Sequence, residues 1–193
     1  MDIKIAIIGY GFVGKATDFG FSKGVKKILI DPKLSTSIKD LEEFNPAFCF
    51  VCVPTPMHED GSQDGKILFD VFEQLSKINY RGTIILKSTV LPDALEKLKS
   101  VTLSFVYNPE FLREKHAEED FINAPFIILG GEKNCLLEVE NLYRNHSLCK
   151  SKKFIQTDIH SASLIKYTIN SFLASKVLFF NQIKKIFEAS KTT

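Results

Sequence analysis

The chain has 193 residues, which is enough for one sizeable core and an extension. Its apolar fraction of 45% and charged fraction of 25% are ordinary for a globular protein, and a net charge of +2 gives no reason to expect a nucleic-acid partner. Because Asp2 and Lys4 interrupt any secretory signal and no apolar run is long enough to span a membrane, we expect a cytoplasmic protein.

A glycine-rich turn with the sequence GYGFVG, at 9–14, follows an apolar run at 3–8 that predicts a buried strand. A helix is expected at 12–23, so the G-x-G-x-x-G spacing falls between a strand and a helix. Gly9 would let the chain turn sharply out of the strand. Gly11 would let a pyrophosphate approach the main chain.

The start of the expected helix has the features of an anion site. Gly14 would let the helix pack closely on the strand. The amides of Phe12 and Val13 have no carbonyl partner within the helix and would therefore face a bound anion. These residues form the predicted phosphate-binding part of a dinucleotide site.

Asp31 follows the next apolar run, at 28–30, about 20 residues after the glycines. An acid at this place can accept hydrogen bonds from the adenosine ribose hydroxyls, and its charge would repel a 2′-phosphate. The sequence therefore favours NAD over NADP as the cofactor. The alternative is that Asp31 is only a turn residue before Pro32.

The rest of the chain alternates apolar runs with amphipathic segments. Further strands are expected at 47–53, 83–87, 102–107, 125–129 and 152–156. Further helices are expected at 64–78, 92–99 and 132–145. This alternation predicts an α/β fold of the Rossmann type for residues 1–157, a doubly wound and mostly parallel sheet with helices on both faces.

The four cysteines do not suggest a metal or disulfide site. Cys49 and Cys52 have C-x-x-C spacing but lie within an expected strand, where residues three apart point to opposite faces. Buried small apolar side chains are the better interpretation of this pair. No spacing of histidine and cysteine in the sequence indicates zinc.

Polar residues gather where three of the expected strands end. The sequences are VPTP at 53–56, KSTV at 87–90 and YNPEFLRE at 107–114. Ligands of such sheets lie beyond the carboxyl ends of the strands. Each segment alone is explained by turn chemistry, but three on one edge beside a dinucleotide loop favour a site.

Residues 158–193 form a second unit, in which 158–189 is expected to be one helix of about 48 Å. The helix is apolar on several sides, so it needs to be covered on several sides. Lys166 and Asn170 are four residues apart and project from one face near its start. A solvated lysine with a polar neighbour is the alternative for this pair.

Taken together and in this order, these segments resemble the NAD-dependent UDP-glucose/GDP-mannose dehydrogenase family. The resemblance covers essentially the whole chain, and NPEFLRE is its most specific part. The segments that carry it are GYGFVG at 9–14, VPTP at 53–56, STV at 88–90, YNPEFLRE at 107–114 and LIKY at 164–167 with Asn170.

The resemblance implies oxidation of a nucleotide sugar, by default UDP-glucose, from the C6 alcohol to the carboxylate with reduction of two NAD. It assigns cofactor contacts to Thr55, Thr89 and Glu114, and it makes Thr89 also a holder of a catalytic water. Glu110 would transfer protons and assist thioester hydrolysis. The remaining assignments are sugar and nucleotide binding by Phe111, Leu112, Arg113 and Glu114, and oxyanion stabilisation at C6 by Lys166 and Asn170.

The family also uses a catalytic cysteine in a second domain, and none of the four cysteines here lies in a matching segment. The chain therefore resembles the NAD-binding half with the start of the connecting helix. The implied partners are a second copy, joined through residues 160–189, and a cysteine-bearing C-terminal half.

Two other functions stay open on the sequence. The chain could be a noncatalytic NAD-binding module that uses its long helix to dock on a partner, although such a module has no need of Glu110, Lys166 and Asn170. It could also be another dehydrogenase with the same fold, such as a 3-hydroxyacid type, but the NPEFLRE segment argues against this.

Overall fold

The computed structural model describes residues 3–22, 24–100, 102 and 104–190. Its strands are β1 (Ile3–Ile8), β2 (Val25–Ile30), β3 (Phe48–Val51), β4 (Thr83–Leu86), β5 (Phe105–Tyr107), β6 (Ile127–Gly131) and β7 (Phe154–Thr157). Its α-helices are α1 (Phe12–Gly20), α2 (Asp40–Phe44), α3 (Lys66–Lys77), α4 (Pro92–Lys99), α5 (Ala117–Ile122), α6 (Lys133–His146) and α7 (Ile159–Ala189). Short 3₁₀ turns, η1 and η2, span Pro32–Leu34 and Glu114–His116.

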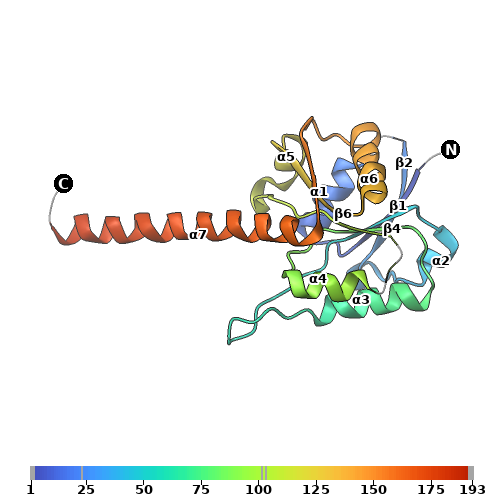
Figure 1. The fold of residues 1–193 in the computed structure, drawn as a ribbon, viewed down its shortest axis with the longest axis horizontal. Helices are drawn as coiled ribbons and strands as arrows, with labels where there is room; N and C mark the ends of the chain where they lie inside the picture. The colour runs from blue at the N-terminus through green and yellow to red at the C-terminus, as the bar shows by residue number, and fades with distance from the viewer. Residues whose placement is uncertain (1–2, 23, 101, 103, 191–193) are drawn as a thin grey trace.

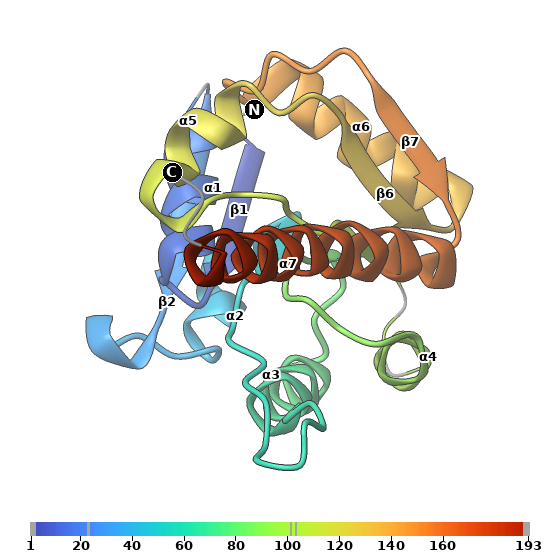
Figure 2. The same cartoon turned by 90° about the vertical axis from the view of Figure 1, so that its left-hand side faces the viewer.

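In the described part of the chain, seven strands form one sheet with the order β2-β1-β3-β4-β5-β6-β7. Neighbouring strands are parallel except for β5 and β6, which are antiparallel. Helices α3 and α4 lie on one side of the sheet and α1, α5 and α6 on the other (Figures 1 and 2). The prediction of a Rossmann-type, mostly parallel sheet followed by a long helix is confirmed.

The antiparallel pair follows from the connection between its two strands. A parallel partner would require a crossover that carries the chain back over the sheet. Between β5 and β6 the chain has only η2 and the six-residue helix α5, which packs beside α1. The chain therefore enters β6 from the edge where β5 ends, and it runs back in the opposite direction.

Several element bounds differ from the sequence predictions. The first helix ends at Gly20, and the last residue predicted for it, Lys23, lies outside the described residues. Strand β5 begins at Phe105 rather than at 102, and the third helix begins at Lys66 rather than at 64. The short elements α2 and α5 were not predicted, because five or six residues are too few to show a helical period.

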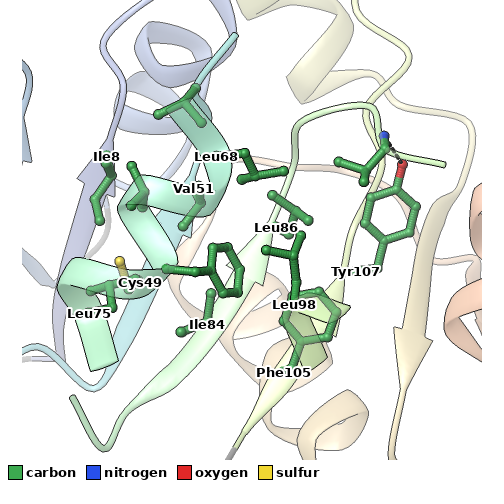
Figure 3. Packing of buried hydrophobic residues seen from close by; sticks show 14 of the residues in the cluster. Ile8, Cys49, Val51, Leu68, Leu75, Ile84, Leu86, Leu98, Phe105 and Tyr107 are labelled. Carbon is green, nitrogen blue, oxygen red and sulfur yellow. Dashed lines mark hydrogen bonds between the residues drawn. The ribbon is translucent and has the colours of Figure 1, made fainter. Parts of the chain in front are cut away.

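Two apolar layers enclose the sheet. Ala6 and Ile8 pack in the layer under α3 and α4, part of which Figure 3 shows, while Ile5 and Ile7 pack under α1 and α6. Strands buried on both faces in this way are typical of parallel sheets. Each fully buried isoleucine or leucine contributes about 1.5–3 kcal/mol to folding.

The positions of Cys49 and Cys52 confirm that residues three apart in this segment point to opposite faces of the sheet. Cys49 lies in the layer under α3 and α4, and Cys52 lies in the opposite layer. Burial raises the pKa of both thiols, that of Cys52 to about 12. Both residues are therefore neutral apolar side chains, as the sequence predicted.

Helix α7 begins on the sheet and then leaves it. The Asp158 carboxylate caps its first turn by accepting a hydrogen bond from the Ser161 amide at 2.8 Å. Ile159 and Ala162 are buried in the core, whereas residues 170–182 and 184–190 are exposed, and Figure 1 shows the helix extending away from the body. Among the described residues no helix is both long and apolar enough to cross a membrane.

Candidate cofactor and substrate site

The three glycines of the turn differ in what surrounds them. Gly9 has φ +90°, and a Cβ there would lie 2.8 Å from the Cys52 carbonyl oxygen. A Cβ at Gly14 would lie 2.0 Å from the carbonyl oxygen of Gly9, so only glycine lets α1 approach the turn this closely. A Cβ at Gly11 would meet no atom within 4 Å, so this backbone is open to a ligand. The surroundings of Gly9 and Gly14 fit the turn and packing roles predicted from the spacing, and the approach of a pyrophosphate to Gly11 stays a prediction.

Asp31 lies at the end of β2, directly beside the glycine turn. Its carboxylate accepts hydrogen bonds from the Tyr10 amide at 2.7 Å and the Lys33 amide at 2.9 Å. These two amides lower the pKa of Asp31, so the side chain is ionised at neutral pH. Asp31 thus has a turn role, and it also lines a cleft.

That cleft has a volume of about 710 Å³ and crosses the carboxyl ends of β2, β1, β3 and β4, where ligands of open α/β sheets bind. It is lined at one end by Asp31 and at the other by Lys87 and Glu110. Six further residues predicted to bind cofactor contribute to the lining: Gly9, Gly11, Phe12, Val13, Thr55 and Thr89. Gly14 is absent from the lining because it faces the turn itself.

The turn after β4 is held by side chains from distant segments. The Thr89 carbonyl accepts hydrogen bonds from Thr55 Oγ1 at 2.9 Å and from Gln63 Nε2 at 2.7 Å. Gln63 also accepts from the Leu91 amide, and its Nε2 lies 3.3 Å from the Tyr167 hydroxyl on α7. These contacts fix the backbone that presents the Thr89 side chain to the cleft. Sequence reasoning missed Gln63, which has no motif of its own.

Glu110 and Lys166 meet although they are 56 residues apart. Lys166 Nζ donates to the Glu110 carbonyl oxygen, and it lies 3.6 Å from the Glu110 carboxylate. The ammonium also sits 4.8 Å from the centre of the Phe111 ring, within cation–π range. Only 4% of Lys166 is exposed, and this burial lowers its pKa despite the nearby carboxylate. The alternative of a solvated lysine is therefore wrong.

A second cleft of about 330 Å³ lies beside the first. Three of the predicted substrate-binding residues, Phe111, Leu112 and Arg113, line it. The Arg113 guanidinium is held by Asp120, with Nε–Oδ2 at 3.0 Å and Nη2–Oδ1 at 2.7 Å. The hydrogen bonds from Arg113 lower the pKa of Asp120 to about 2.

Four predicted site residues line neither cleft: Gly14, Glu114, Lys166 and Asn170. Glu114 is exposed at the start of η2 and lines neither cleft. Asn170 is exposed on α7, one turn beyond Lys166, and also lines neither cleft. Their contacts with cofactor or substrate stay predictions.

Lys87 is a second functional candidate that sequence reasoning missed. It is 4% exposed and lines both clefts. Its ammonium donates to Asn108 Oδ1 at 3.1 Å and to the Tyr143 hydroxyl at 3.3 Å, and Tyr143 donates to the same Asn108 oxygen at 2.6 Å. A charged residue at the end of an otherwise apolar strand was the signal that could have found it.

Comparison with protein families identifies the family of this chain. Residues 33–147 match the model of the UDP-glucose/GDP-mannose dehydrogenase family, NAD binding domain. The chain belongs to this family. Its cofactor is accordingly NAD, as the glycine turn and Asp31 predict.

Individual relatives agree with the family match. The chain is 37% identical over 160 residues to a UDP-glucose 6-dehydrogenase of Rickettsia felis, which covers 79% of this chain and 36% of that protein. It is 31% identical over 231 residues to a putative UDP-glucose 6-dehydrogenase of Bacillus subtilis, with 97% of this chain and 53% of that protein covered. The matches therefore span about a third to a half of the relatives' length.

A solved structure has the same fold. A GDP-mannose dehydrogenase from Pseudomonas aeruginosa, solved as a ternary complex, superposes with a TM-score of 0.82 over 98% of this chain and 54% of that chain, at 23% identity. A 3-hydroxyisobutyrate dehydrogenase from Mycobacterium tuberculosis also has this fold, with a TM-score of 0.72 at 14% identity. At these identities the likeness concerns the fold alone.

Proposed function

We propose that this chain is the NAD-binding part of a nucleotide-sugar dehydrogenase that oxidises the C6 alcohol of UDP-glucose to the carboxylate. The observation that carries the proposal is the Glu110–Lys166 pair, in which Glu110 lines both the cofactor cleft and the second cleft and the buried Lys166 lies behind it. A noncatalytic module would have no use for a buried ammonium and a carboxylate at this place.

The residues of the pair divide the chemistry of alcohol oxidation. NAD, when bound, supplies the hydride acceptor. Glu110 is a base beside the second cleft and can move the hydroxyl proton, directly or through a water on Thr89. The buried Lys166 ammonium, with Asn170 one helical turn away, donates to the alkoxide that develops at C6. Phe111, Leu112 and Arg113 shape the cleft that would hold the sugar.

Thioester formation in the second oxidation needs a thiolate, and the described cysteines do not provide one. Cys52 is the cysteine that lines the cofactor cleft, and its raised pKa keeps it a thiol. We therefore assign the nucleophile to a cysteine-bearing C-terminal half. Residues 1–193 with NAD and UDP-glucose should form NADH slowly and yield the aldehyde, with products resolved by chromatography. Uronate made by residues 1–193 alone would contradict this assignment.

The cofactor preference should depend on Asp31. Asp31→Ala should weaken NAD binding by about tenfold or more, because hydrogen bonds to a charged group contribute about 1.5–3 kcal/mol. It should weaken NADP binding less, because the repulsion of the 2′-phosphate is lost as well. Titration calorimetry with both cofactors measures this, and Asp31→Asn is the matched control that keeps one acceptor oxygen. Equal affinity of the parent for NAD and NADP would count against the role of Asp31.

The exposed part of α7 should join two copies of the chain. Its exposed apolar side chains, each at least half exposed, are Phe172, Leu173, Val177, Leu178, Phe179, Phe180, Ile186 and Phe187. Exposed apolar side chains in this number usually mark an interface. Light scattering should show a dimer for the parent and a monomer for Phe180→Glu, while Lys39→Gln on the remote surface should stay dimeric. A parent that is monomeric at high concentration would refute this proposal.

A further inference from the structure

The two clefts adjoin at the place where a bound cofactor and a bound substrate would react. Lys87 and Glu110 are the residues that line both clefts in the described part of the chain. Glu110 already has a role in the proposed reaction, as the group that moves a proton. Lys87 has none, although burying its ammonium opposes folding unless a function or a partner compensates for it.

The charges at this junction do not cancel. The Glu110 carboxylate lies 3.6 Å from the Lys166 ammonium, so these two form one neutral pair. The hydrogen-bond partners of Lys87, Asn108 and Tyr143, are neutral, because burial raises the pKa of Tyr143 well above its usual value. Burial lowers the pKa of both lysines, and the attraction of Glu110 opposes this effect. When both lysines are protonated, one carboxylate faces two ammonium groups and one positive charge is left over.

The order of the strands along the cofactor cleft places the charge of Lys87 at the nicotinamide end of a bound dinucleotide. Asp31 follows β2, Lys87 follows β4, and β1 and β3 lie between these strands. With the adenosine ribose at Asp31 and the pyrophosphate at the glycine turn, the nicotinamide of a bound NAD would extend toward Lys87 and Glu110. The oxidised nicotinamide ring is positively charged. Accepting a hydride, two electrons with one proton, makes it neutral.

We propose that Lys87 makes the site discriminate between the two redox forms of its cofactor, because the uncompensated charge of its protonated form repels oxidised nicotinamide and tolerates the reduced form. The inference rests on the proposed function, since it needs NAD in this orientation. Lys87 would thereby favour transfer of the hydride from the sugar to the cofactor, and it would hold NADH after the transfer. It is thus a further residue of the reaction centre that acts on the cofactor.

Calorimetric titration of the parent and of Lys87→Met with NAD⁺ and with NADH tests the proposal without any turnover. The parent should bind NADH more tightly than NAD⁺. Lys87→Met should bind NAD⁺ more tightly than the parent does, and the preference for NADH should fall by about tenfold, a modest effect for a buried charge. A gain of affinity cannot come from a damaged fold.

Three comparison variants separate charge from packing. Lys87→Arg keeps the charge and should keep the preference for NADH. Tyr143→Phe removes one hydrogen-bond partner of Lys87 but no charge, and should also keep it. Lys33→Met removes a lysine that lines the same cleft at the Asp31 end, and should change the affinities for both redox forms by a similar factor.

The outcomes are distinguishable. A Lys87→Met variant that binds both forms with the parental ratio would overturn the inference and leave the proposed function standing. A Lys33→Met variant that shifts the ratio as much as Lys87→Met would also overturn it, because the effect would then not be local. A parent that binds neither NAD⁺ nor NADH would overturn the proposed function together with the inference.

Discussion

Replacing Gly14 by alanine should abolish NAD binding and lower the free energy of unfolding by about 3 kcal/mol or more. The added Cβ would lie 2.0 Å from the Gly9 carbonyl oxygen and 3.1 Å from its carbon. Both atoms belong to the backbone, so no side chain can rotate away to relieve the contact. The turn cannot move easily either, because the Gly9 amide donates to the Ile30 carbonyl at 2.8 Å. Helix α1 must therefore shift away from the turn whose amides are predicted to bind the cofactor.

Gly11→Ala is the matched control for Gly14→Ala, because it adds the same methyl group within the same glycine turn. Gly11 has φ −75°, which alanine adopts readily, and its Cβ would meet no atom within 4 Å. We expect this variant to unfold in urea at nearly the parental concentration and yet to bind NAD weakly, since the methyl group projects into the space of the pyrophosphate. Parental stability and parental NAD affinity in Gly14→Ala would contradict this account of the turn.

The sequence could predict the roles of the turn glycines and the burial of two cysteines because both depend on local geometry. The roles of Gly9, Gly11 and Gly14 follow from their spacing between a strand and a helix. The opposite burial of Cys49 and Cys52 follows from the two-residue period of a strand. The family resemblance, and no local rule, assigned Glu110 and Lys166 to one reaction, and their contact across 56 residues appears only in the folded chain.

The features that could not be predicted depend on contacts between distant segments. Lys87 donates a hydrogen bond to Tyr143, which is 56 residues away on helix α6. Gln63 reaches Tyr167 across 104 residues. The antiparallel direction of β6 depends on what a 19-residue connection, 108–126, does in three dimensions. No period or motif in one short window carries such information, so these features appear only in the folded chain.

Lys166→Met should lower the rate of NADH formation from UDP-glucose by about 10²–10³-fold, the usual cost of removing one donor to a developing oxyanion. Methionine has a similar length and keeps the packing on Phe111, so the change removes mainly the charge and its hydrogen bonds. Lys166 does not line the cofactor cleft, and NAD affinity should therefore stay close to that of the parent. The rate is measured at saturating NAD by the absorbance of NADH, and calorimetry checks the affinity. Asn170→Ala, one turn along α7 and exposed, should have a smaller effect.

The pH dependence of the rate of NADH formation is a second test of the role of Lys166. Burial lowers the pKa of Lys166, so its ammonium loses a proton at a pH below the ordinary lysine value of 10.5. Because the protonated form is the donor, the rate should fall as pH rises through this lowered pKa, while NAD binding persists. Lys166→Arg stays charged throughout this range and should remove the alkaline decline, even if its geometry lowers the rate. A parent and a Lys166→Met variant that form NADH at equal rates would show that the buried ammonium does not act on the C6 oxygen.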